Sequence, residues 1–342
     1  MSGRIPATIV TGFLGAGKTT LIRHLVEATQ DRRLALVINE FGDVGVDGEI
    51  LQACGGADCE APHIVELANG CLCCTVADDF VPAIEALLAL DAPPEHIVIE
   101  TSGLALPRPL VKAFDWPQIR SRLFVDGVVA VVDGPAVAQG RFADDLEALA
   151  RERADDASVD HENPLEEVFE DQIACADIVV LNKIDLLAPE EEARVMEILR
   201  SGAGRASILR ARRGVVDPRV ALGVGATIQS DLANRPTRHE AEEDHDHDDF
   251  DSFVVDVAPA VDPESLVARL SQVAAAHEVL RMKGFVEVAG KPMRLLVQGV
   301  GVRFQHHYDR PWRADEARAS RLVVIGRKGL DREAIAQRLL GR

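Results

Sequence analysis

Short apolar runs rich in Val and Ile alternate, over the first two thirds of the chain, with longer segments of helical periodicity. The runs show no alternation with polar residues, so they predict strands buried on both faces, as in a parallel sheet. Strands separated by helices predict a doubly wound, mainly parallel α/β sheet, with ligands bound at the carboxyl ends of the strands. The expected strands are Ile5–Val10, Leu34–Ile38, His96–Ile99, Val128–Val132 and Ile178–Leu181.

The pattern changes after about residue 210. Residues 239–251 hold eight carboxylates and three histidines in thirteen positions, so we interpret 236–251 as an acidic, histidine-rich linker. A large α/β domain is then expected at 1–235 and a smaller α+β domain at 252–342. The elements expected in the smaller domain are strand Phe253–Val257, a helix Pro263–Ala275 opening after Asp262, strands Val279–Val288, Arg294–Val300, Val302–Tyr308 and Leu322–Ile325, and a helix from Leu330.

The charge balance excludes some partners. The formal net charge of −19, from 37 basic and 56 acidic residues, opposes binding to nucleic acids and to anionic membranes. No apolar run approaches the roughly 18 residues of a membrane span, and the N-terminus lacks the layout of a signal peptide. We therefore expect a cytoplasmic protein. In a reducing compartment, six cysteines with three of them inside four residues indicate metal or redox chemistry.

A phosphate-binding loop follows the first predicted strand. Gly12-Phe13-Leu14-Gly15-Ala16-Gly17-Lys18-Thr19 matches the phosphate-loop pattern and precedes a predicted helix over Lys18–Ala28. Backbone N–H groups and the helix N-terminus hold phosphates in such loops, while the lysine reaches the outer phosphates and the threonine hydroxyl binds Mg²⁺. The alternative is a glycine-rich structural turn. The expected nucleotide contacts are Gly12, Gly15, Ala16, Gly17, Lys18, Thr19 and Thr20.

A base-reading loop is predicted at Asn182-Lys183-Ile184-Asp185, directly after a buried strand. A carboxylate at Asp185 accepts two hydrogen bonds from guanine, whereas adenine presents an acceptor at the equivalent ring nitrogen. Asn182, Lys183 and Asp185 are therefore expected to bind GTP rather than ATP. A surface turn is the alternative for this tetrapeptide alone.

Between these two motifs, the strand His96–Ile99 ends in Glu100-Thr101-Ser102-Gly103. Glu100 is expected to hold Mg²⁺ through its water shell, and Gly103 to let the loop approach the terminal phosphate. Together with Lys18 and Thr19, Glu100 completes the predicted catalytic set for GTP hydrolysis.

Three cysteines form the second chemical signature. Cys71, Cys73 and Cys74 lie close enough in sequence for a loop to turn two or three sulfurs toward one ion, and thiolates suit Zn²⁺, Co²⁺ or Cu⁺. Glu40 is an additional oxygen ligand or a solvated carboxylate. The alternatives are a buried apolar cysteine patch and a redox pair of Cys71 and Cys74.

The order GFLGAGKTT, NEFG, GCLCC, ETSG and NKID resembles the CobW family of P-loop GTPases, which act as metallochaperones, and the resemblance covers nearly the whole chain. The segments NGCLCCTVADDF, ETSGLALPRPLV and LRMKGF most resemble its cobalamin-biosynthesis branch. That resemblance implies a GTPase that binds Co²⁺ through Cys71, Cys73 and Cys74 and delivers it to cobaltochelatase.

Three other functions fit the same motifs. A zinc chaperone would share all of them, because Zn²⁺ binds such sites at least as tightly as Co²⁺. A metal store or sensor would bind its ion regardless of the nucleotide. In a metal-free regulatory GTPase the thiols would be dispensable.

Overall fold

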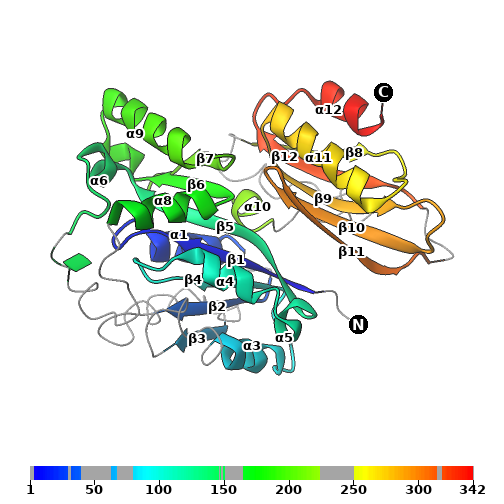
Figure 1. Ribbon diagram of the computed structural model, residues 1–342, viewed down its shortest axis with the longest axis horizontal. Helices are drawn as coiled ribbons and strands as arrows, with labels where there is room; N and C mark the ends of the chain where they lie inside the picture. The colour runs from blue at the N-terminus through cyan, green and yellow to red at the C-terminus, as the bar shows by residue number, and fades with distance from the viewer. Residues whose placement is uncertain are drawn as a thin grey trace. The chain divides into compact units, whose positions relative to one another are not determined.

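The computed structural model describes residues 4–29, 32–39, 63–67, 80–145, 147, 149–150, 165–223, 250–313 and 318–341. The chain divides into two compact units, Met1–Ala221 and Leu222–Arg342 (Figure 1). No helix within these ranges is both long and apolar enough to cross a membrane.

The first unit is built on a seven-stranded parallel sheet in the order β3-β2-β4-β1-β5-β6-β7 (Figure 1). All five strands predicted from the apolar runs are present, so the doubly wound fold is confirmed. The edge strands β3 and β7 were not predicted. The strands are β1 (Ile5–Thr11), β2 (Leu34–Asn39), β3 (His63–Leu67), β4 (His96–Glu100), β5 (Leu123–Asp133), β6 (Ile178–Asn182) and β7 (Ser207–Arg210).

Helices cover this sheet. Apolar residues of α3, α4 and α5 pack with β1, β2 and β4 in one cluster, and those of α6, α8 and α9 pack with β5 and β6 in another. Because the strands are parallel, the carboxyl ends of β1, β4, β5 and β6 share one edge of the sheet. The helical elements are α1 (Lys18–Glu27), α3 (Val81–Leu88), α4 (Pro107–Ala113), α5 (Pro117–Arg120), α6 (Gly134–Ala138), α8 (Leu165–Cys175), η2 (Ile184–Leu186), α9 (Pro189–Gly202) and α10 (Pro218–Ala221).

The second unit contains a five-stranded antiparallel sheet in the order β11-β10-β9-β12-β8. Helices α11 and α12 bury their apolar residues against it, which confirms the smaller α+β fold. The elements are β8 (Phe250–Asp256), α11 (Pro263–His277), β9 (Val279–Glu287), β10 (Met293–Val300), β11 (Arg303–Pro311), β12 (Arg321–Arg327) and α12 (Arg332–Leu339).

Two boundaries in this unit can be compared with the sequence. Asp262 caps α11 as expected, because its carboxylate accepts a hydrogen bond of 2.8 Å from the Ser265 N–H. The Ser265 hydroxyl donates to the same carboxylate, and these bonds lower the pKa of Asp262. Strand β8 begins at Phe250, three residues before the predicted start, so residues 250 and 251 belong to the sheet. The rest of the predicted linker lies outside the described residues.

Candidate nucleotide site

The loop between β1 and α1 has a shape that requires glycine. Gly12, Gly15 and Gly17 have φ values of 138°, 74° and 101°, in the region that L-residues rarely adopt. A Cβ at Gly12 would overlap the carbonyl oxygen of Val131, and one at Gly17 would overlap the side-chain amide of Asn182. At Gly15, no atom of the described residues lies within 4 Å of such a Cβ. The loop is therefore packed on two sides and open at Gly15, as a phosphate cradle must be.

The two reactive side chains of the loop point to different partners. Lys18 is 8% exposed, and its Nζ donates over 3.4 Å to the carbonyl oxygen of Phe13, at the start of the loop. Thr19 Oγ1 donates over 3.2 Å to Oε1 of Glu100, the last residue of β4. A hydroxyl and a carboxylate from two different elements thus lie side by side. Both are hard oxygen donors of the kind that Mg²⁺ prefers.

The segment after Glu100 is fastened to the end of β1. The Thr101 N–H donates over 3.0 Å to the carbonyl oxygen of Val10, and the Thr101 hydroxyl donates over 3.0 Å to the hydroxyl oxygen of Thr11. The next residue, Ser102, is buried, and its hydroxyl has no hydrogen-bond partner among the described residues. A buried hydroxyl without a protein partner beside a phosphate loop is a candidate ligand contact. Sequence reasoning gave Ser102 no role.

Asn182 makes two contacts that the sequence did not predict. Its side-chain nitrogen donates over 2.9 Å to the carbonyl oxygen of Ala16, and its oxygen accepts over 2.9 Å from the Gly214 N–H. Both bonds are buried, so Asn182 ties the phosphate loop to the loop that follows β7. Asp185 lies in η2, is exposed, and makes no hydrogen bond or ion pair with the described part of the chain. Its carboxylate is therefore open to a ligand.

Two residues that the sequence analysis did not single out support this loop. The Lys183 ammonium lies 2.5 Å from Oδ2 of Asp133, the fully buried last residue of β5. Oδ1 of Asp133 accepts over 3.1 Å from the Ala136 N–H and so caps α6. Gly214 fits closely against α1, since a Cβ there would lie 2.7 Å from the Leu21 nitrogen. An acidic residue at the end of a buried strand, followed by Gly-Pro, was the available signal for Asp133.

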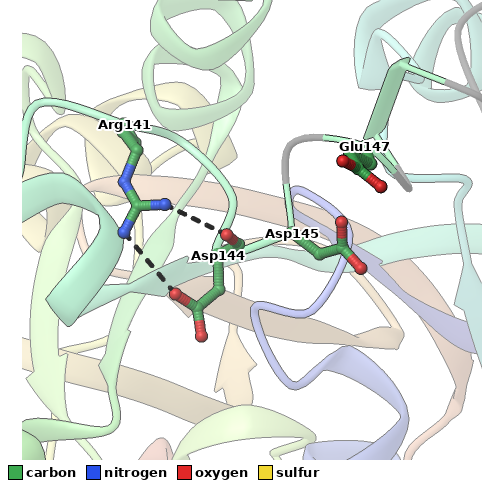
Figure 2. Close-up of a pocket in the computed structure, with 4 residues that line it drawn as sticks. All are labelled: Arg141, Asp144, Asp145 and Glu147. Atoms are coloured by element: carbon green, nitrogen blue, oxygen red, sulfur yellow. Dashed lines mark hydrogen bonds and ion pairs between the residues drawn. The ribbon is translucent and has the colours of Figure 1, made fainter.

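A polar hollow lies beside the segment that follows α6. Arg141, Asp144, Asp145 and Glu147 line it (Figure 2). The Arg141 guanidinium donates over 3.1 Å to the Asp144 carbonyl oxygen and lies 3.7 Å from its carboxylate. Phe142, in the same segment, packs on Phe13 of the phosphate loop, with ring centroids 5.6 Å apart. Arg141 directly precedes Phe142 in the sequence, and its charge is paired with Asp144.

The predicted metal ligands Glu40, Cys71, Cys73 and Cys74 all lie outside the described residues. Within the ranges given above, no group of three or more His, Cys, Asp or Glu side chains is arranged to hold a metal ion.

Comparison with known proteins gives two family matches and several full-length relatives. The model of the CobW/HypB/UreG nucleotide-binding domain matches residues 6–210, and that of the cobalamin synthesis protein cobW C-terminal domain matches residues 250–341. Zinc chaperone CobW of Sinorhizobium sp is 52% identical over 338 residues, which are 97% of this chain and 96% of that protein.

Zinc chaperone CobW of Pseudomonas aeruginosa is also 52% identical, over 98% of this chain and 91% of that protein. Zinc chaperone YjiA of Escherichia coli is 30% identical over 94% of both chains. A crystal structure of Zn(II)-bound YjiA GTPase from E. coli covers 98% of both chains at 24% identity, with a TM-score of 0.43.

Proposed function

Because this chain belongs to the family of the CobW/HypB/UreG nucleotide-binding domain and carries the cobW C-terminal domain, we propose that it is a GTP-hydrolysing metallochaperone. The observation that carries the proposal is the hydrogen bond of 3.2 Å between Thr19 and Glu100, next to a glycine-dependent phosphate loop. This contact supports a shared Mg²⁺ site for the two predicted ligands, next to the loop proposed to bind the phosphates. The names of the relatives, which are zinc chaperones and zinc-regulated GTPases, support the same activity.

The described residues have distinct roles in nucleotide binding and hydrolysis. The N–H groups around the open side at Gly15 bind phosphate oxygens, and Lys18 leaves the Phe13 carbonyl to neutralise the outer phosphates. Thr19 and Glu100 hold Mg²⁺, which neutralises charge on the phosphates when it is bound. Asp185 selects guanine because its exposed carboxylate needs two donors from the base. Asn182 supports the phosphate loop through its bond to Ala16, and Asp133 supports the Asp185 loop through its ion pair with Lys183.

The cargo is proposed to be Zn²⁺, held by thiolates of Cys71, Cys73 and Cys74 with Glu40 as a further ligand. Two relatives that are 52% identical over nearly the full length are named zinc chaperones, which favours the zinc alternative over the Co²⁺ expectation. Soft thiolate ligands suit both ions, so the protein that receives the metal would decide between them. Delivery of Co²⁺ to cobaltochelatase stays a prediction.

The decisive experiment measures metal affinity in the two nucleotide states. Zn²⁺ and, separately, Co²⁺ are titrated against a competing chelator with a non-hydrolysable GTP analogue or GDP bound. A chaperone should hold its ion about 5–150-fold more tightly in the GTP state, which is the range of ordinary allosteric coupling. Cys73→Ala and Cys74→Ala should abolish the difference. Equal affinity in the two states would indicate a metal store instead.

A transfer assay then identifies the client. Metal-loaded protein is mixed with purified cobaltochelatase or with an apo zinc enzyme, and GTP is added. GTP-dependent activation of the zinc enzyme alone would support the zinc assignment. Activation of the chelatase alone would restore the cobalt prediction. We also propose a cytoplasmic location, because thiolate ligands need a reducing compartment to stay unoxidised.

A further inference from the structure

Helix α8 contacts the loop that follows β4 through one buried side chain. Gln172 is 1% exposed, and its side-chain nitrogen donates over 3.0 Å to the Gly103 carbonyl oxygen and over 3.1 Å to that of Ala105. Both protons of one amide nitrogen are thus directed to carbonyl oxygens two residues apart in the same loop. The loop and the glutamine are separated by 67 to 69 positions in sequence.

The same helix also contacts the phosphate loop and the element after the Glu100 loop. Phe169, one turn before Gln172, packs on Phe13 with ring centroids 6.3 Å apart. Asp171 forms an ion pair of 2.9 Å with Arg108 of α4. Helix α8 therefore contacts the phosphate loop through Phe169 and the Glu100 loop through Gln172.

The Glu100 loop is fixed at its two ends. At the first end, Thr101 is bonded to β1 and Glu100 accepts from Thr19. At the other end, Gly103 and Ala105 are held by Gln172. Ser102 lies between the two ends, with a hydroxyl that has no partner among the described residues. The segment of the loop that remains available to a ligand is therefore the one at Ser102, between the two attachments.

We propose that Gln172 is a positioning residue that holds the Glu100 loop in the conformation that detects the terminal phosphate, and so sets the preference for GTP over GDP. The proposal rests on the proposed function, because it concerns the same nucleotide. Loops that read a terminal phosphate have two arrangements, and a contact present in one of them shifts the equilibrium. The amide suits this role because its nitrogen supplies two donors, one to each of two carbonyl oxygens of the loop.

The chemistry of the bond makes a substitution series informative. Gln172→Glu keeps the shape but replaces the donating nitrogen with an accepting oxygen, which repels the two carbonyl oxygens. Gln172→Leu keeps much of the volume and removes both donors. Gln172→Asn keeps the amide but shortens the side chain by one methylene, so its nitrogen can keep at most part of the two hydrogen bonds to the carbonyl oxygens. Asp171→Asn is the matched control, because it weakens a partly exposed ion pair on the same helix without touching the loop.

The test measures affinity for GDP and for a non-hydrolysable GTP analogue by titration of each variant. Gln172→Leu and Gln172→Glu should lose at least tenfold in affinity for the GTP analogue, while affinity for GDP changes less than threefold. Gln172→Asn should be intermediate, and Asp171→Asn should keep the wild-type ratio. In steady-state hydrolysis, the GTP concentration that gives half the maximal rate should rise most in Gln172→Leu and Gln172→Glu, less in Gln172→Asn, and not in Asp171→Asn.

Each outcome decides the proposal. Equal losses of affinity for GDP and for the GTP analogue would mean that Gln172 has only a structural role. An unchanged ratio of the two affinities in a folded Gln172→Leu variant would therefore overturn the proposal. If Gln172→Leu does not fold, Gln172→Asn gives the same comparison. If the wild-type protein itself binds neither guanine nucleotide, the proposed function fails instead, and the two failures are thereby distinguished.

Discussion

The ion pair between Lys183 of the predicted base-reading loop and Asp133 gives a prediction whose free energy can be estimated. Asp133→Asn keeps an oxygen that accepts from the Ala136 N–H, so the cap of α6 remains, but it removes the charge that pairs with Lys183. Hydrogen bonds between charged groups contribute about 1.5–3 kcal/mol. The Lys183 side chain is 26% exposed, so water competes for its ammonium, and we expect a loss of about 1–2 kcal/mol.

Two further variants separate the contributions. Asp133→Ala also removes the cap, which adds about 1 kcal/mol to the loss. Lys183→Met leaves the fully buried Asp133 carboxylate without its counter-charge and should cost about 2–4 kcal/mol. Asp133→Asn combined with Lys183→Met removes both charges, so its cost should be smaller than the sum of the two single variants.

Thermal unfolding with and without GDP provides the assay. The transition that GDP moves upward belongs to the nucleotide-binding unit, since a ligand stabilises the unit that binds it. For a unit of about this size, 1 kcal/mol corresponds to about 2–4 °C, so Asp133→Asn should lower that transition by about 2–8 °C. A wild-type melting temperature for Asp133→Asn, or strict additivity in the double variant, would refute the argument that this pair stabilises the loop.

Three other predictions concern the nucleotide site. Asp185→Asn should weaken GTP binding by at least tenfold and shift preference toward xanthosine triphosphate, because an amide can donate to the carbonyl that xanthine carries in place of the guanine amine; unchanged GTP affinity in titrations would remove Asp185 from the base site. Thr19→Ala should reduce hydrolysis by at least a hundredfold while circular dichroism stays that of a folded protein, since Thr19 acts on Mg²⁺ and is not part of the core; a variant that loses its folded signal would make the residue structural. Gly12→Ala should abolish nucleotide binding measured by titration, because its Cβ would overlap the Val131 carbonyl oxygen and φ is 138°; wild-type binding would show that the loop can adopt another path.

A further prediction tests the histidine-rich segment. Deletion of residues 239–251 should leave the nucleotide-dependent metal affinity within about tenfold of wild type, because histidines at irregular spacing add binding capacity more than selectivity. Loss of tight Zn²⁺ binding in the chelator competition would assign those histidines to the principal site.

Local signals in the sequence determined the strands, the phosphate loop and the boundaries of most elements. The five apolar runs became β1, β2, β4, β5 and β6 because burial on both faces requires continuous apolar residues. The phosphate loop could be recognised because its glycines, Lys18 and Thr19 lie within eight consecutive residues, at the spacing of the phosphate-loop pattern. Asp262 was likewise recognisable as a cap from its place before Pro263.

Only the tertiary structure decided which distant residues support the site. Asp133 meets Lys183 across 50 positions, Asn182 meets Ala16 across 166, and Gln172 meets Gly103 across 69. Each of these contacts depends on how parallel strands are ordered in the sheet, because that order brings the ends of β1, β4, β5 and β6 to one edge. A single sequence does not contain the order of the strands, so the contacts by which the Asn182 amide joins two loops were not predicted.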